Sequence, residues 1–274
     1  MKKNVLYISI SLTVCIIIGL AYKFHQYYAP PRIRQPYLIN VTPDDTLRIA
    51  YIGDSWAAIH KEHECIIAKI IEDSIHLPVI ISSFGIRGKT SKEIYENLFD
   101  NGEFRLFLSK RRYQYCYISA GINDTYKKMS TSYYQQSMDG IIRLLLSNHI
   151  YPILQEIPDY DIHMSFERQK PSRILLRQCS MIINNTPLDC KQRFRDALDE
   201  LIQKKGYQDK VSIIRYESWN NNYKNDLKNY YNDDHMHLNE KGYSILDSVI
   251  ANEIITQRSR QIRPHTQHLL FCIH

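Results

Sequence analysis

A serine at the end of an apolar run is the first residue in this chain that could act as a nucleophile. Ser55 follows Gly53 and Asp54, directly after the run Ile49-Ala50-Tyr51-Ile52, which is typical of a buried strand. A helical apolar pattern comes next, so we expect Ser55 at a strand's carboxyl end with its backbone N–H near a helix N-terminus. Amide donors are then available to an oxyanion formed after attack by the serine. The simpler alternative is that Asp54 and Ser55 only cap the helix.

A base and an orienting carboxylate occur together near the other end of the chain. A serine hydroxyl is a weak nucleophile and needs a neighbouring base. Asp234 and His237 are three residues apart, so the carboxylate can reach the imidazole and select its tautomer. His235 is the alternative base, but its spacing from Asp234 is less suitable.

Two further segments contain donors that could stabilise an oxyanion. Gly88 lies in a predicted turn after the second strand and presents its backbone N–H without a side chain, and Asn123 follows the third strand with an amide group. Together with the N–H of Ser55 they would form an oxyanion hole, in which each donor is worth roughly 100- to 1,000-fold in rate. Alternatively, Gly88 is an ordinary turn glycine and Asn123 an ordinary helix cap.

The segments that position these residues alternate between strand and helix patterns. We expect strands over 47–52, 77–81, 113–119, 150–157 and 210–216, and helices over 58–74, from about 90, 131–148, 190–205 and 239–256, with an irregular or helical insertion at 159–188. Thr90 and Glu93 have the spacing of a capping box. This alternation predicts an α/β domain with a parallel sheet covered on both faces and a site at the strands' carboxyl ends.

The chain resembles the SGNH (GDSL-type) hydrolases in four sequence blocks and in their order. These blocks are Gly53-Asp54-Ser55, Gly88, Asn123 and Asp234-x-x-His237. The resemblance covers about 48–255. It implies a flavodoxin-like three-layer α/β/α sandwich with a five-stranded parallel sheet and an esterase or related acyl-transfer activity. It also implies that Ser55, Asp234 and His237 are catalytic and that Ser55, Gly88 and Asn123 form the oxyanion hole.

Two residues depart from the family pattern. Trp56 stands where leucine is usual, and Lys89 where many members have aspartate. A large indole beside the attacked carbonyl would narrow the acyl side of the site and could pack on a sugar ring, so Trp56 is a candidate substrate-binding residue. The alternative is that Trp56 turns inward and packs beneath the first helix.

No feature indicates a cofactor or a required metal. His60, His63, Glu64 and Cys65 lie close together, but the charged residues among them predict a solvated helix face. The six cysteines have no metal-site spacing, and only Cys179 and Cys190 are close enough in sequence to suggest a disulfide. The net charge of +6 comes without a basic stripe, which argues against a nucleic-acid partner.

The N-terminal segment is a membrane anchor or a signal peptide. Lys2 and Lys3 precede an apolar run over 5–22, which is about 27 Å of helix. Small residues around Gly19 and Ala21 fit a cleavage site, whereas the length of the run favours an anchor. We therefore divide the chain into an N-terminal hydrophobic helix (1–29), a spacer (30–46), a hydrolase-type domain (47–257) and a basic tail (258–274) that we expect to be poorly ordered.

The sequence thus predicts a membrane-tethered serine esterase that removes O-acyl groups, most simply O-acetyl, from a carbohydrate or other small ester. The anchor would place the domain outside the cytoplasm, in the periplasm or at the cell surface, and cleavage would make it secreted. Tyrosines are abundant, and those at Tyr223, Tyr230 and Tyr231 could face a sugar or simply pack. The alternatives are an O-acyltransferase that uses the same triad on a glycan, and a non-catalytic glycan-binding domain.

Overall fold

The computed structural model describes residues 2–41, 45–63, 65–100, 102–220 and 222–270. Its centre is a five-stranded, all-parallel sheet with the strand order β2-β1-β3-β4-β5. The strands are β1 (Leu47–Gly53), β2 (Val79–Gly85), β3 (Tyr115–Ser119), β4 (Tyr151–Gln155) and β5 (Ser212–Ile214). This order is that of flavodoxin-like folds, in which the site lies at the carboxyl ends of the strands. The predicted fold class is confirmed.

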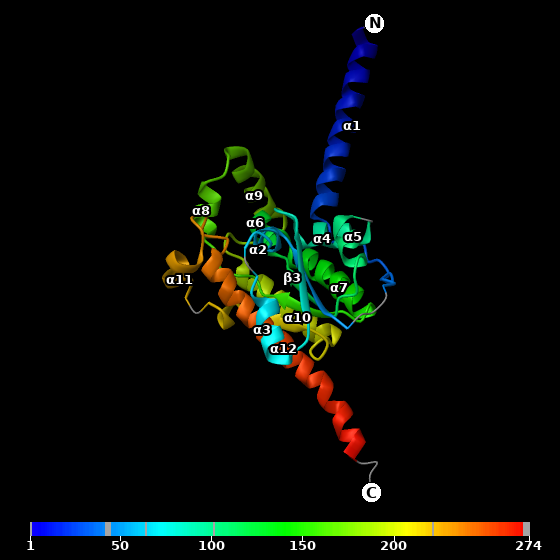
Figure 1. Cartoon of the computed structure of the whole chain (residues 1–274). Coiled ribbons are helices and arrows are strands. Elements are labelled where there is room, and N and C mark those ends of the chain that lie inside the picture. The colour runs from blue at the N-terminus through cyan, green and yellow to red at the C-terminus, as the bar shows by residue number, and fades with distance from the viewer. Residues whose placement is uncertain (1, 42–44, 64, 101, 221, 271–274) are drawn as a thin grey trace.

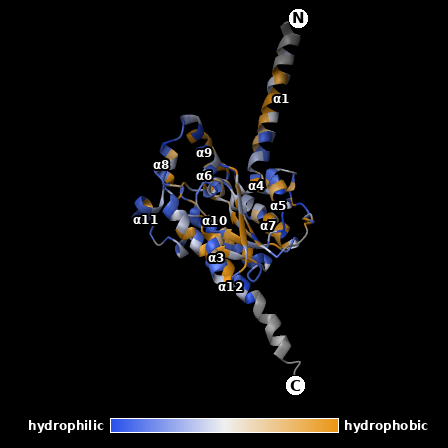
Figure 2. Cartoon of the chain, in the orientation of Figure 1, coloured by the Kyte–Doolittle hydropathy of each residue, from blue (hydrophilic) through white to orange (hydrophobic). Residues whose placement is uncertain are grey.

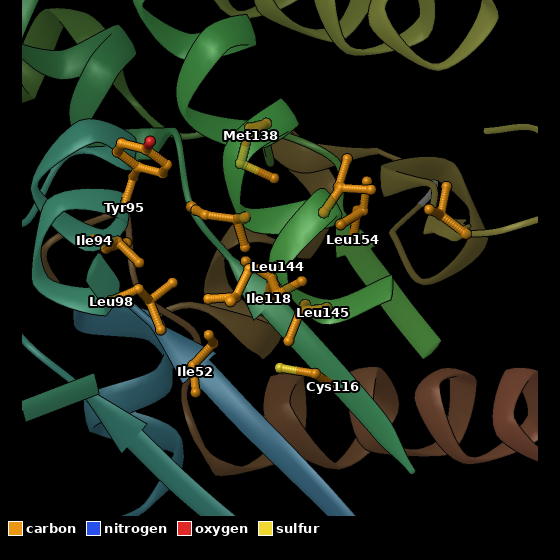
Figure 3. Packing of buried hydrophobic residues seen from close by; sticks show 14 of the residues in the cluster. Ile52, Ile94, Tyr95, Leu98, Cys116, Ile118, Met138, Leu144, Leu145 and Leu154 are labelled. Carbon is orange, nitrogen blue, oxygen red and sulfur yellow. The ribbon is translucent and has the colours of Figure 1, made fainter. Parts of the chain in front are cut away.

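Two hydrophobic layers cover the sheet because strand side chains alternate between its faces. Ala50 and Ile52 of β1 belong to the cluster beneath α4 (Ser91–Phe99), α5 (Glu103–Ser109), α7 (Thr131–Ser147) and α10 (Lys191–Lys205), part of which Figure 3 shows. Ile49 and Tyr51 belong to the opposite cluster, with α2 (Ser55–His60), α3 (Ile67–Ile75) and α12 (Glu240–Leu270).

The first helix after β1 differs from the prediction. In place of one helix over 58–74, α2 ends at His60 and α3 begins at Ile67. The side chain of His60 is buried, and its Nε2 forms a hydrogen bond with one carboxylate oxygen of Asp247 in α12 (2.7 Å). The other carboxylate oxygen of Asp247 accepts a hydrogen bond from the N–H of Ile66 (3.1 Å). A residue distant in sequence therefore satisfies the backbone at the break, which apolar periodicity cannot reveal.

The remaining elements of the domain are close to their predicted positions, although β2 continues to Gly85. The predicted capping box of Thr90 and Glu93 begins α4. The insertion at 159–188 is helical, with α8 (Ile162–Glu167) and α9 (Pro171–Ile183), which project from the body on the side from which α1 (Lys2–Tyr28) rises (Figure 1). Shorter elements complete the chain: α6 (Ile122–Lys127), a 3-10 turn at Tyr216–Ser218 and α11 (Tyr223–Tyr230).

The first and last elements of the described chain are long helices. One stretch of α1, Ile10–Tyr28, is long and apolar enough to cross a membrane, and it is exposed from Ile10 to Tyr27 (Figure 2). The spacer that follows lies against the domain, since Tyr37 Oη donates to the carbonyl of Leu98 (3.0 Å). The C-terminal helix α12 is longer than the predicted 239–256, since it continues to Leu270.

Candidate active site

Ser55 lies where β1 passes into α2. Gly53 ends the strand, and a Cβ there would come within 2.1 Å of Ser119 Oγ on the neighbouring β3, so only glycine permits this close approach. Asp54 caps α2 by accepting the N–H of Trp56 (3.0 Å), and Ser55 is the first helical residue. Its N–H has no acceptor within the helix and is available to a ligand.

The loop before α12 brings a histidine to this serine. His237 Nε2 lies 2.7 Å from Ser55 Oγ, and His237 Nδ1 lies 2.5 Å from Asp234 Oδ2. Asp234 Oδ1 also accepts the backbone N–H groups of Met236 (3.0 Å) and His237 (2.9 Å). Burial opposes ionisation of Asp234, but the bonds from the ring and backbone of His237 outweigh it and lower the pKa of Asp234 to about 2. The carboxylate is therefore ionised at neutral pH, as an orienting group requires.

His235, the alternative base, is turned away from Ser55. Its backbone is left-handed (φ 56°), and its carbonyl accepts the N–H of Asp161 (3.1 Å) and the hydroxyl of Tyr223 (2.7 Å). The imidazole faces Asp161, with Nδ1 3.9 Å from the carboxylate. Of the two histidines, only His237 makes a hydrogen bond to Ser55 in the described part of the chain.

The predicted oxyanion donors lie beside the serine segment. Gly88 has φ +76°, a left-handed conformation that favours glycine, and is exposed. Asn123 Nδ2 donates to the carbonyl of Lys89 (3.0 Å), in the turn that holds Gly88, and to Asp54 Oδ2 (3.2 Å). An amide has two N–H bonds. To bind an oxyanion, Asn123 must therefore release one of these acceptors.

Asp54 has a second role at the site, which the sequence did not predict. Besides capping α2, its buried carboxyl accepts the amide of Asn123 and so connects the serine segment to the third strand's loop. Burial raises the pKa of Asp54 to about 7, although hydrogen bonds from Trp56 and Asn123 favour its ionised form. The Gly-Asp-Ser sequence was the available signal, but it equally suggested a simple cap.

The expectation that Trp56 lines the substrate site is not met. Its side chain is only 1% exposed and packs against Trp219 and Tyr243, at ring-centroid distances of 5.9 and 6.2 Å. Trp56 therefore follows the inward alternative. The indole packs between α2 and the core, because it makes more apolar contacts in the core than it would at the solvent-facing site.

The cluster around His60 is not a solvated helix face as predicted. His60 is buried, and ligand atoms of His60, Cys65 and Asp247 all lie within 4.8 Å of one another, while Glu64 lies outside the described residues. In the structure His60 and Asp247 bond each other directly, which gives both a partner. Cys179 and Cys190 are free thiols, so the suggested disulfide is absent between them.

A cleft of about 900 Å³ opens beside the histidine loop. Its walls come from the segments after β4 and β5, from α8 and α11 and from the start of α10, and include Tyr160, Tyr216, Tyr223, Asp161 and Asn220. The lining mixes tyrosine rings with both signs of charge. Tyr223 and Asp161 donate hydrogen bonds to the carbonyl of His235. One wall of the cleft therefore supports the loop that contains Asp234 and His237.

Solved structures show the same architecture at low sequence identity. A lipase/acylhydrolase from Enterococcus faecalis superposes with a TM-score of 0.51 at 18% identity, covering 76% of this chain and 95% of its own. A lipolytic G-D-S-L family protein from Veillonella parvula gives 0.51 at 16% identity, covering 77% and 99%. The acetyl xylan esterase AlAXEase gives 0.50 at 14% identity, covering 76% and 100%. At these identities the likeness concerns the fold alone.

Sequence similarity places the chain more narrowly than the fold does. No curated protein matches it. The model of the GDSL-like Lipase/Acylhydrolase family matches residues 51–245, a span that begins within β1 before Ser55 and continues past His237. The chain therefore belongs to the GDSL-like lipase/acylhydrolase family.

Proposed function

We propose that this protein is a membrane-tethered serine esterase that removes O-acyl groups, most simply O-acetyl, from a carbohydrate. The observation that carries the proposal is the continuous chain of contacts from Ser55 Oγ to His237 Nε2 (2.7 Å) and from His237 Nδ1 to Asp234 Oδ2 (2.5 Å). A protein that only binds glycans has no need of a nucleophile, a base and an ionised orienting group in one line.

The proposed reaction uses these groups in the order of the contacts. His237 takes the proton from Ser55 as Oγ attacks the ester carbonyl, and Asp234 stabilises the imidazolium that forms. The N–H groups of Ser55 and Gly88, and Asn123 once it has exchanged an acceptor, bind the oxyanion. His237 then protonates the leaving alcohol, and water, activated by the same imidazole, releases the acid from the acyl-enzyme.

The carbohydrate and the location rest on separate observations. The cleft beside the histidine loop has a polar lining with paired charges and the half-buried ring of Tyr223, and we assign the alcohol portion of the ester to it. The apolar stretch Ile10–Tyr28, exposed as far as Tyr27, supplies a tether, with the domain on the outer side.

Labelling with a fluorophosphonate tests the nucleophile. We expect wild-type protein to be labelled at Ser55 and to hydrolyse acetyl esters, and Ser55→Ala to lose both properties with an unchanged melting temperature. His235→Ala is the matched control and should keep most activity, since its ring faces Asp161. Labelling of Ser55→Ala at the wild-type rate would contradict the assignment. Adding a sugar acceptor to the same assay distinguishes transfer from hydrolysis by the product formed.

A further inference from the structure

Helix α9 carries its apolar side chains on the outside. Leu175 and Ile182 are 62% and 81% exposed, and Leu176 and Ile183 are exposed as well. With the half-buried Cys179 these residues have the spacing i, i+1, i+4, i+7 and i+8, which places them on one face of the helix. A surface helix of a soluble protein shows the opposite arrangement, and a contiguous exposed apolar face marks a contact surface.

The inward face of α9 is occupied by polar side chains. Arg177 is buried with its guanidinium over the rings of Tyr126 (4.2 Å) and Phe166 (4.8 Å), and Ser180 is buried against α1. These contacts hold the helix in this orientation. The apolar face therefore cannot be buried by turning α9 about its axis without exposing Arg177's partners and breaking the contact of Ser180.

The apolar face of α9 is continuous with the apolar surface of α1. Ile183 lines a cleft of about 620 Å³ together with Ile17, Leu20 and Phe24 of α1. Tyr28 at the end of α1 bonds Ser180 of α9. Both helices extend from the same side of the domain, and Figure 2 shows hydrophobic residues along α1 and on parts of α9.

The end of α1 is also held by the domain itself. Lys92 Nζ donates to the carbonyls of Gln26 (2.7 Å) and Ala29 (2.8 Å), so the helix leaves the body in a defined direction. Around the N-terminal end of α9, Arg168, Lys170 and Arg173 are exposed. An apolar stripe with basic residues beside it is the pattern of helices that lie in a membrane interface and attract anionic lipid headgroups.

We infer that the apolar face of α9 docks on the outer surface of the lipid bilayer that holds α1. This inference rests on the proposed role of α1 as a membrane tether. The contact fixes the active site relative to the bilayer, because Asp161 caps α8 and its N–H donates to the carbonyl of His235 (3.1 Å). Arg168 of the same pair reaches the carbonyl of Asp233 (3.4 Å). The domain thus addresses esters presented at the membrane surface.

Tryptophan quenching by brominated lipid tests this contact in the full chain, reconstituted in nanodiscs of phosphatidylcholine and phosphatidylglycerol. The reporter is Leu176→Trp. The matched controls are Leu12→Trp within α1 and Lys204→Trp at the exposed end of α10, and the native Trp56 and Trp219 give a buried background. We expect bromolipid to quench Leu176→Trp and Leu12→Trp and to leave Lys204→Trp unchanged. Adding Leu175→Glu and Ile182→Glu to the Leu176→Trp reporter should remove its quenching.

Three results would overturn the inference. Quenching of Leu12→Trp without quenching of Leu176→Trp would show that α1 enters the bilayer and α9 does not. The absence of quenching in both variants would contradict the proposed role of α1 as a membrane tether as well. Disulfide crosslinking of Leu176→Cys between two copies in the nanodisc would show a second copy as the occupant. Hydrolysis of a soluble acetyl ester, measured on the same variants, is expected to stay at the wild-type rate and tests the esterase function separately.

Discussion

At the scale of single residues, Asp54 connects the proposed nucleophile to the proposed oxyanion donor. Its carboxyl caps the helix of Ser55 with one oxygen and accepts the Asn123 amide with the other. The residue is 1% exposed, and burial raises its pKa from 3.8 to about 7. A protonated Asp54 would be a weaker acceptor for the Asn123 amide than the carboxylate is.

The titration of Asp54 is directly measurable. Between pH 3.8 and about 7 the folded protein retains a proton that the unfolded chain has lost, so this group's contribution to the free energy of unfolding falls as the pH rises through that window. The carboxyl carbon resonance of Asp54 in an NMR titration should show a midpoint near 7, and Asp54→Asn identifies the signal by its loss. A midpoint at or below 3.8 would show that hydrogen bonding outweighs burial.

Residue spacing predicted which side chains would gather, but not all their contacts. Asp234 and His237 are three residues apart, and a separation this short restricts them to one loop. The link between Asp54 and Asn123 crosses 69 residues, and the inward turn of Trp56 depends on Trp219 and Tyr243. These contacts depend on which elements are neighbours in space, information that local spacing does not contain.

At the scale of elements, the break between α2 and α3 depends on one buried carboxylate. Asp247 of α12 is 0% exposed and satisfies both His60 and the N–H of Ile66. Apolar periodicity over 58–74 predicted an uninterrupted helix because it registers which residues are buried. It does not register a polar partner on a helix almost 200 residues later.

Removing the carboxylate of Asp247 should lower the free energy of unfolding substantially. Asp247→Ala leaves a buried imidazole and a backbone N–H without their acceptor, and we expect the free energy of unfolding to fall by about 3–5 kcal/mol. The exposed Asp209→Ala, as a control, should change it by less than about 0.5 kcal/mol. Denaturant unfolding followed by circular dichroism measures both. A loss below about 1 kcal/mol for Asp247→Ala would mean that the break in the helix does not depend on this contact.

At the scale of the whole molecule, the alternation of apolar strands and helices was sufficient to predict the sheet and its two covering layers. Each strand has a short apolar run, and the even and odd residues of β1 enter different clusters. The arrangement of the insertion was not predictable, because the apolar residues of α9 point away from the domain. Their exposure is explained by the neighbouring apolar surface of α1, which lies more than 140 residues earlier in the chain.

Ser55 and His237 are proposed to act as one catalytic unit, and a double-mutant cycle tests this most directly. The kcat for an acetyl ester is measured for the wild type, Ser55→Ala, His237→Ala and the double variant, with His235→Ala as the control. Because the serine and its base serve the same step, each single variant should lose nearly all turnover, and the double variant should be little worse than either. Retention of substantial turnover by either single variant, or a double loss equal to the product of the two single losses, would contradict the account.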